Sequence, residues 1–230
     1  MKCPTCHKEM QPLSEIKTTQ VIFPVLDGFG NPWLCEDSLA HRLELVGTFN
    51  GDYDESYFNG EVYQKYEDFP AHEQRVDKLI RITHPKSVLD VGCAYGYIVK
   101  RLLDKGIDAW GCDVSEYAES RAKEIIPGRF KRCPAWDMPY QSGSIDVIYC
   151  EGVLEHIPED KIEATFKEFQ RIGHRFYLQA SLQEHPGVNL EPGHVCVKNT
   201  DWWLERIPMD SWFLLSPSGS DSGIYWIYKG

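Results

Sequence analysis

The apolar residues of this chain follow two alternating patterns between residues 71 and 180. Apolar residues recur at helical spacing in four segments, which predicts helices at 71–83, 97–104, 115–126 and 161–172. Short apolar runs predict strands at 87–91, 108–113, 130–135, 145–150 and 175–180. Because the strands alternate with helices, we expect an α/β sandwich with helices on both faces of the sheet.

The C-terminal part of the chain shows a different pattern. Asn199 is a suitable N-cap for a helix that runs to Leu204. Residues 212–215 and 224–228 form two further apolar runs, and the Ser- and Gly-rich segment 216–223 between them is typical of a hairpin loop. We therefore expect the sheet to end in an antiparallel pair of strands.

A loop of small residues directly follows the strand at 87–91, in the sequence SVLDVGCAYG. The small residues that let the backbone turn and approach a ligand closely are Gly92, Ala94 and Gly96. A dinucleotide site requires Gly-x-Gly-x-x-Gly, and Tyr97 stands where the third glycine is needed. Asp90 precedes the loop, and its negative charge suits a cationic ligand better than a phosphate.

The pattern Leu-Asp-Val-Gly-x-Ala-x-Gly resembles the first motif of the Rossmann-like S-adenosylmethionine-dependent methyltransferases. The resemblance extends over roughly residues 57 to 205. It implies a three-layer sandwich with a seven-stranded, mostly parallel sheet and a C-terminal antiparallel hairpin. It also implies three regions: an N-terminal segment at 1–47, an aromatic linker with helices at 48–84 that covers the cofactor, and the methyltransferase core at 85–230.

Several residues are expected to bind the cofactor, S-adenosylmethionine. Asp113 ends the second strand about twenty residues after the glycine loop, which is the spacing of a ribose-binding acid. The family usually carries an adenine-contacting Asp where this chain has Pro134, and Asp137 is a candidate substitute. The full set of expected cofactor-binding residues is Asp90, Gly92, Ala94, Gly96, Asp113, Val114, Ala135, Trp136, Asp137, Glu151 and Tyr63.

Transfer of a methyl group to an oxygen requires removal of a proton, which usually calls for a base. The candidates for this role are Glu151, Glu155, His156, His185 and His194, and of these Glu155, His156 and His194 are the expected catalytic residues. Residues 154–158, Leu-Glu-His-Ile-Pro, resemble a segment of the ubiquinone-biosynthesis O-methyltransferases and their relatives. In some relatives a Glu-x-x-Glu-His set binds a divalent metal, but Gly152 stands where the first Glu is needed. A histidine that is simply hydrogen-bonded to the backbone is the alternative for His156.

The segment 48–70 is dense in Tyr and Phe. In related methyltransferases the segment before the first strand folds over the cofactor. Tyr57, Tyr63 and Tyr66 are therefore candidates to contact the methionine end of the cofactor or the acceptor. The alternative is that these rings only pack the linker against the sheet.

The N-terminal sequence MKCPTCHKEM contains a Cys-x-x-Cys turn that resembles the first knuckle of a zinc ribbon. Tetrahedral zinc needs four ligands. The candidate ligands are Cys3, Cys6, Cys35 and His41, with His7 as a weaker choice. Such a zinc would be structural, because a small segment with little core needs it to fold. A pair of free thiols is the alternative.

Composition narrows the choice of partners and compartment. The net charge is −11, from 24 basic and 35 acidic residues. Nucleic acid is therefore not an expected partner, because non-specific binding to it relies on basic residues. No apolar run reaches the length of a membrane span, and the N-terminus lacks a signal-peptide pattern. The remaining cysteines do not form a disulfide pattern, which favours a reducing, cytoplasmic location.

These observations together predict a methyltransferase that acts on oxygen, or on nitrogen, of a small-molecule or glycan acceptor. Two alternatives stay open: a methyltransferase of a protein or an RNA, and a non-catalytic module that binds the cofactor or recruits a partner through zinc. Fold analogy does not name the acceptor. The oligomeric state is also left open by the sequence.

Overall fold

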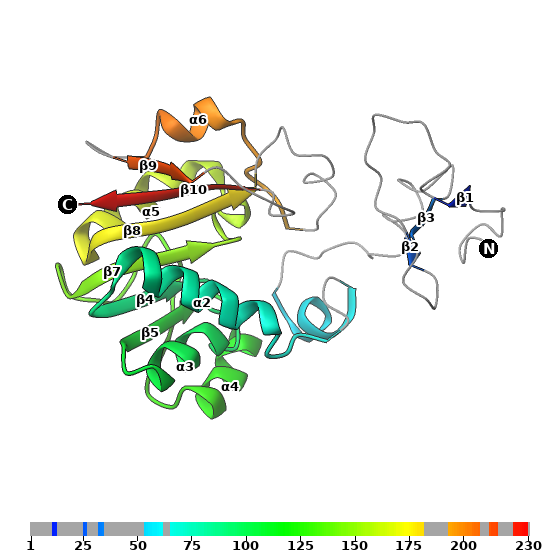
Figure 1. The fold of residues 1–230 in the computed structure, drawn as a ribbon, viewed down its shortest axis with the longest axis horizontal. Helices are drawn as coiled ribbons and strands as arrows, with labels where there is room; N and C mark the ends of the chain where they lie inside the picture. Colours follow the sequence, from blue (N-terminus) through cyan, green and yellow to red (C-terminus); the bar gives the residue numbers. More distant parts are fainter. Residues whose placement is uncertain are drawn as a thin grey trace.

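A seven-stranded sheet forms the centre of the computed structural model (Figure 1). The structure describes residues 11–12, 25–26, 32–34, 53–61, 65–181, 193–207, 212–215 and 223–229. The strands of the sheet are β4 (Ser87–Val91), β5 (Asp108–Asp113), β6 (Phe130–Arg132), β7 (Ile145–Glu151), β8 (Gly173–Ser181), β9 (Trp212–Leu215) and β10 (Gly223–Lys229). Their order is β6-β5-β4-β7-β8-β10-β9.

The first five strands in this order, β6, β5, β4, β7 and β8, run parallel to one another. β10 pairs antiparallel with β8 on one side and with β9 on the other. The expected parallel α/β sheet is therefore confirmed, and β9 and β10 extend it at one edge. Because all five parallel strands point the same way, their carboxyl ends meet at one edge of the sheet, where ligands bind in open α/β folds.

The helices connect successive strands as the hydrophobic pattern predicts. They are α2 (Pro70–Thr83), α3 (Tyr97–Asp104), α4 (Glu116–Ile125), α5 (Glu159–Ile172) and α6 (Thr200–Leu204), with the short helical segments η2 (Tyr57–Glu61) and η3 (Leu154–His156). The expected cap of α6 is present, because the Asn199 side chain accepts a hydrogen bond from the Trp202 N–H. Ser115 caps α4 in the same way through the Ala118 N–H.

Two hydrophobic cores lie on opposite faces of the sheet. Neighbouring residues of β4 alternate between them: Val88 packs with side chains of α2, α3 and α4, and Leu89 packs with side chains of α5 and with Trp203. This alternation follows from the two-residue period of a strand. The molecule thus has three layers, with α2, α3 and α4 together on one side of the sheet (Figure 1).

Several element boundaries differ from the sequence-based expectation, and a proline accounts for two of them. The strand expected at 130–135 ends at Arg132. Cys133 still donates its N–H to the Asp113 carbonyl, but Pro134 follows and has no N–H to continue the ladder. The helix expected at 161–172 begins at Glu159, because Pro158 occupies its N-cap position.

A separate small sheet lies near the N-terminus in sequence. It consists of β1 (Gln11–Pro12), β2 (Val25–Leu26) and β3 (Pro32–Leu34), with β3 paired antiparallel to both neighbours. The sequence-based interpretation did not anticipate these strands. The expected zinc ligands Cys3, Cys6, Cys35 and His41 lie outside the described residues, so the zinc hypothesis stays a prediction.

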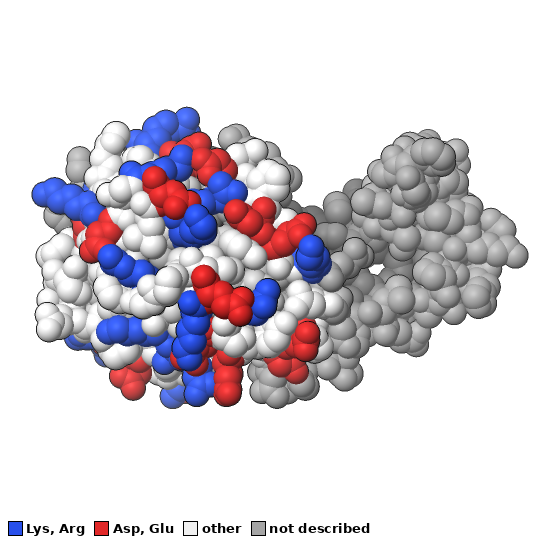
Figure 2. Space-filling view, turned by 90° about the horizontal axis from the view of Figure 1, so that it is seen from below, with Lys and Arg blue, Asp and Glu red and all other residues white. Residues whose placement is uncertain are grey.

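Charged side chains of both signs are interspersed over the face seen in Figure 2. Many of them form ion pairs, such as those of Arg101 with Asp68 and Glu73 between α3 and the start of α2. No helix among the described residues is long and apolar enough to cross a membrane. The described cysteines are all buried free thiols.

Candidate functional site

The glycine loop after β4 is held against the end of β5 by backbone hydrogen bonds. The N–H groups of Gly92 and Cys93 both donate to the Cys112 carbonyl, at 2.8 and 3.0 Å. Gly92 has a φ of 75° and Ala94 a φ of 47°, both in the left-handed region. A Cβ at Gly92 would also lie only 2.3 Å from a methyl carbon of Val153. The loop is therefore compact as well as sharply turned.

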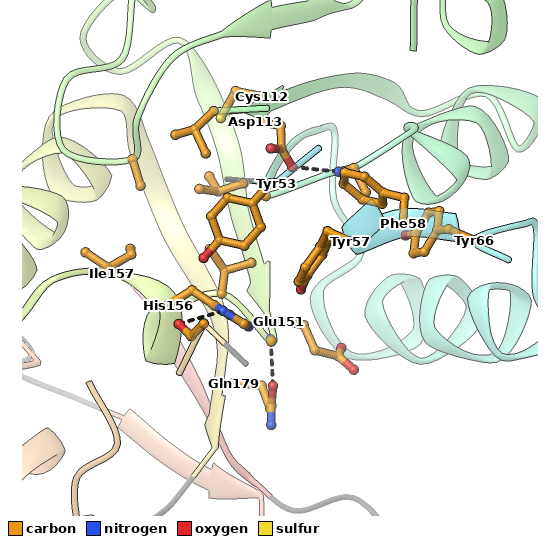
Figure 3. A pocket seen from close by; sticks show the side chains of 18 of the residues that line it. Tyr53, Tyr57, Phe58, Tyr66, Cys112, Asp113, Glu151, His156, Ile157 and Gln179 are labelled. Atoms are coloured by element: carbon orange, nitrogen blue, oxygen red, sulfur yellow. Dashed lines mark hydrogen bonds between the residues drawn. The ribbon is translucent and has the colours of Figure 1, made fainter. Parts of the chain in front are cut away.

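Asp113 ends β5 beside this loop, and both of its carboxylate oxygens accept backbone hydrogen bonds. The Ala94 N–H donates to Oδ2 (Figure 3), and the Ser115 N–H donates to Oδ1, each at 2.9 Å. Burial raises the pKa of Asp113, while these hydrogen bonds counteract the shift. The two bonds fix the orientation of the carboxylate at the carboxyl edge of the sheet.

The strand register brings three carboxylates to the same face of the sheet. Asp90 of β4 is opposite Gly111 of β5 and Tyr149 of β7. Asp113 and Glu151 each lie two residues beyond these partners, so their side chains share the face of Asp90. This is the face that α2, α3 and α4 cover. Three neighbouring strand ends thus place carboxyl groups beside the glycine loop.

The three carboxylates differ in their partners. Glu151 forms an ion pair with Arg75 of α2 at 3.0 Å and accepts a hydrogen bond from the Tyr149 hydroxyl at 2.6 Å. Asp90 is only 4% exposed. Burial, together with the charges of Asp113 and Glu151, raises the pKa of Asp90 to about 8.

A pocket of about 680 Å³ opens above these strand ends (Figure 3). Many of the residues predicted to bind the cofactor or to act as the base line this pocket: Gly92, Ala94, Asp113, Val114, Ala135, Trp136, Glu151 and His156. Five other predicted residues are described but do not line it: Asp90, Gly96, Asp137, Glu155 and His194. Tyr63 lies outside the described residues. The structure therefore brings most of the predicted residues to one cavity.

One side of the pocket is apolar. Val114, Ala135 and Trp136 line it together with Cys112 and Cys133. Val114 is 46% exposed, although large apolar side chains in the described part of the chain are otherwise mostly covered. Such a wall suits a flat aromatic ligand. Asp137, the candidate substitute for the missing Asp at Pro134, is exposed and is not among the residues that line the pocket.

His156 lies at the opposite end of the pocket, on η3 (Figure 3). Its Nδ1 is 3.1 Å from the Gly193 carbonyl, which only accepts hydrogen bonds. Nδ1 therefore carries the proton, and Nε2 is the basic nitrogen of the neutral ring. His194 packs edge-on against the His156 ring with centroids 4.7 Å apart, and Tyr53 contacts the ring from the pocket side at 5.9 Å.

The segment that carries His194 is attached to the loop of His156. The N–H groups of Val195 and Cys196 both donate to the Glu155 carbonyl at 2.9 Å. Glu155 itself is buried and does not line the pocket. Val195 does line it and is 61% exposed, which leaves an apolar side chain at the rim. Of Glu155, His156 and His194, only His156 lines the cavity.

Gln179 is a pocket residue that the sequence-based interpretation missed. It lies near the end of β8, and its Oε1 accepts a hydrogen bond from the Gly152 N–H at 2.7 Å (Figure 3). This bond fixes the orientation of the Gln179 side chain. Arg75, Cys112, Cys133 and Tyr53 also line the cavity without having been predicted. The sequence indicated Gln179 only as a polar residue near the end of the largely apolar strand predicted at 175–180.

Aromatic residues before α2 cover the pocket from the side opposite the sheet. Tyr53, Tyr57, Phe58 and Tyr66 all line it. The Ser115 hydroxyl donates to the Tyr53 carbonyl, and Phe58 packs against Tyr95 and Tyr117. Both alternatives for this segment thus have support: the rings pack on the loops after β4 and β5, and they also face the cavity.

The described residues contain no group of three or more His, Cys, Asp or Glu side chains that could hold a metal ion. Glu151 lies beside Arg75 and Tyr149, and Glu155 is buried and does not line the pocket.

Comparison with known proteins gives the central part of the chain a family match. Residues 88–174 match the model of the "Methyltransferase domain" family. The matched segment runs from β4 through α5, and it contains Asp90, Asp113 and His156.

Two similar curated proteins are both named "Ubiquinone biosynthesis O-methyltransferase". The protein from Acinetobacter baylyi is 27% identical over 81 residues, which is 32% of this chain and 34% of the relative. The protein from Idiomarina loihiensis is 31% identical over 100 residues, which is 40% of this chain and 41% of the relative. The chain thus spans about a third to two fifths of the length of these relatives.

A similar solved structure is the N-terminal domain of EvdMO1 with SAH bound. It superposes with a TM-score of 0.55 at 16% sequence identity, over 83% of this chain and 94% of that chain. Similarity at this level of identity shows the fold. The chain therefore shares the fold of this domain, and its residues 88–174 match a methyltransferase domain.

Proposed function

We propose that this protein is an S-adenosylmethionine-dependent methyltransferase. The observation that carries the proposal is the pocket between the glycine loop, Asp113 and His156, at the carboxyl edge of the parallel sheet. The match of residues 88–174 to a methyltransferase domain supports it. In this proposal residues 85–230 form the core, and residues 48–84 cover the cofactor.

The residues that line the pocket fit the chemical parts of S-adenosylmethionine. Asp113 is oriented to accept hydrogen bonds from two ribose hydroxyls, because its backbone bonds leave further lone pairs on each oxygen. The apolar wall at Val114 and Trp136 suits the adenine ring. Asp90 and Glu151 add negative charge near the glycine loop, which suits the cationic methionine end.

For the methyl transfer itself, the main contribution of the protein is to align the acceptor with the methyl group. S-adenosylmethionine supplies a methyl group on a sulfonium, so the leaving group is already activated. The pocket walls hold the acceptor in line, and alignment alone contributes on the order of 7–11 kcal/mol in good cases. The aromatic cover over the pocket, which includes Tyr53 and Tyr57, excludes water from the reacting atoms.

We further propose that the acceptor is a hydroxyl group of a small molecule and that His156 is its base. The hydrogen bond from Nδ1 to the Gly193 carbonyl holds the ring so that Nε2 accepts the hydroxyl proton. The relatives named as O-methyltransferases favour oxygen over nitrogen. A panel of phenols, sugars and amines, assayed for methylated product, distinguishes these acceptor classes.

Calorimetric titration with S-adenosylmethionine tests the proposed cofactor. We expect micromolar binding, about −8 kcal/mol, in the wild-type protein and a loss of at least tenfold in Asp113→Ala. Asp108→Ala is the matched control, because Asp108 lies at the other end of the same strand and is exposed. Failure of the folded wild-type protein to bind the cofactor contradicts the proposal.

A further inference from the structure

Asp90 is the carboxylate of the site that has no hydrogen bond from the described residues. Asp113 accepts two backbone N–H groups, and Glu151 is paired with Arg75 and Tyr149. Asp90 is 4% exposed, and no donor among the residues that the structure describes reaches its carboxylate. A buried carboxylate without donors or a cation is costly in its ionised form.

The charged groups around Asp90 add to this cost. Asp113 from β5 and Glu151 from β7 share its face of the sheet and repel a negative charge there. The cation that acts on it is Arg75 from α2, and Arg75 is paired with Glu151. The other titratable groups near it, Tyr149, Cys150 and Cys93, are buried, and their pKa values are raised by burial, so they are neutral.

We propose that the Asp90 carboxyl carries a proton in the free protein and releases this proton when the cationic methionine end of S-adenosylmethionine binds. The inference rests on the proposed function and deepens it. The O–H bond of the carboxyl breaks, the proton leaves to solvent, and the negative charge of the carboxylate beside the glycine loop then stabilises the bound cation. Binding of the cofactor thus replaces the proton on buried Asp90 with the positive charge of the cofactor.

The proton exchange gives cofactor binding a defined pH dependence. The raised pKa of Asp90, about 8, makes the protonated form dominant in the free protein at pH 6 to 7. In this range binding competes with a proton, so affinity rises with pH by up to about tenfold per pH unit. Above pH 8 the carboxylate is already ionised, and the dependence on Asp90 disappears.

Calorimetry in two buffers of different ionisation enthalpy measures the released protons directly. The titration of wild-type protein with S-adenosylmethionine is carried out at pH 6.5 in phosphate and in imidazole buffer. At this pH the α-amino group of the cofactor is already protonated, because amines of this kind have a pKa of about 7.7–8.0. We expect close to one proton released per cofactor bound.

Asp90→Asn is the variant that tests the assignment, and Asp108→Asn is its matched control on an exposed carboxylate. In Asp90→Asn we expect proton release near zero and an affinity that no longer rises between pH 6 and pH 8. Asp108→Asn is expected to behave like the wild-type protein in both measurements. Thermal melting of each variant verifies that it is folded.

Two results overturn the inference while leaving the proposed function intact: cofactor binding by the wild-type protein without proton release, or unchanged release in folded Asp90→Asn. The wild-type measurement decides the question even if Asp90→Asn does not fold. Absence of any cofactor binding by the wild-type protein contradicts the proposed function instead. The two proposals therefore fail in different ways.

Discussion

At the scale of single residues, the geometry of His156 carries the proposed chemistry. Its Nδ1 is held by the Gly193 carbonyl, and its ring is packed between His194 and Tyr53. A base works only when its lone pair points at the proton that it removes. The sequence offered five candidate bases. Of the described ones, His156 and Glu151 line the pocket, and Glu151 is paired with Arg75 and Tyr149.

His156→Ala is therefore expected to lower kcat by about 10²–10⁴-fold, because general-base catalysis contributes about that much. The affinity for S-adenosylmethionine is expected to stay within a fewfold of the wild-type value. The measurement is steady-state methylation of an acceptor identified from the panel, with calorimetry for the cofactor. His174→Ala is the control, because His174 is exposed near the start of β8, whereas the pocket lies at the other end of this strand. An unchanged kcat in His156→Ala excludes it as the base.

Gln179 shows how a single buried amide supports the site. Its Oε1 accepts the Gly152 N–H at 2.7 Å. Gln179→Leu leaves this backbone donor without its acceptor, which costs about 1–3 kcal/mol. We expect a lower free energy of unfolding in urea for Gln179→Leu, and a smaller loss for Gln179→Glu, which keeps an acceptor oxygen. Equal stability of all three proteins contradicts this role.

At the scale of elements, the start of α4 links the core to the aromatic segment above the pocket. The Ser115 hydroxyl accepts the Ala118 N–H as an N-cap and donates to the Tyr53 carbonyl. Ser115→Ala removes both bonds, and loss of a cap alone costs about 1 kcal/mol. We expect lower thermal stability and weaker cofactor binding. Ser120→Ala is the control, because Ser120 is exposed on the same helix and bonds only to Tyr117 among the described residues. A similar effect in both variants would argue against a special role for Ser115.

The glycine loop gives a second prediction at this scale. A methyl group at residue 92 overlaps Val153, and the φ of 75° disfavours any side chain there. Gly92→Ala is expected to destabilise the protein by about 1–3 kcal/mol and to abolish cofactor binding. Gly92→Ala combined with Val153→Ala removes the overlap but not the strain, so urea denaturation should show partial recovery. Full stability of Gly92→Ala alone contradicts the close packing of this loop.

At the scale of the whole molecule, the buried carboxyl of Asp90 makes stability depend on pH. Asp90 has a folded-state pKa of about 8, above its ordinary value of 3.8. The folded protein therefore binds more protons than the unfolded chain between pH 4 and pH 8, and its stability falls as pH rises through this window. The full effect is on the order of 5 kcal/mol.

Urea denaturation of the cofactor-free protein at pH 6 and pH 9 measures this effect. We expect the wild-type protein to lose stability between the two values and Asp90→Asn to lose much less. At pH 9 the Asp90→Asn protein is expected to be the more stable of the two. Asp108→Asn should follow the wild-type protein, since Asp108 is exposed. Parallel pH curves for wild-type protein and Asp90→Asn contradict the burial cost assigned to this carboxylate.

The sequence by itself determined the parallel α/β sheet, the glycine loop after β4 and the acid at the end of β5. These are local features, because hydrophobic period, loop residues and spacing along one chain encode them. The extra strands β1, β2 and β3, by contrast, are only two or three residues long and leave no periodic pattern to detect.

Only the tertiary structure decided which side chains share the pocket. The sheet register placed Asp90, Asp113 and Glu151 on one face, and the arrangement of α2 added Arg75 to them. The Gly193 carbonyl and Gln179 come from segments far from η3 in sequence, so no local pattern indicated their roles. Contacts between strands depend on register and packing, and a single sequence read along its length does not contain that information in local form.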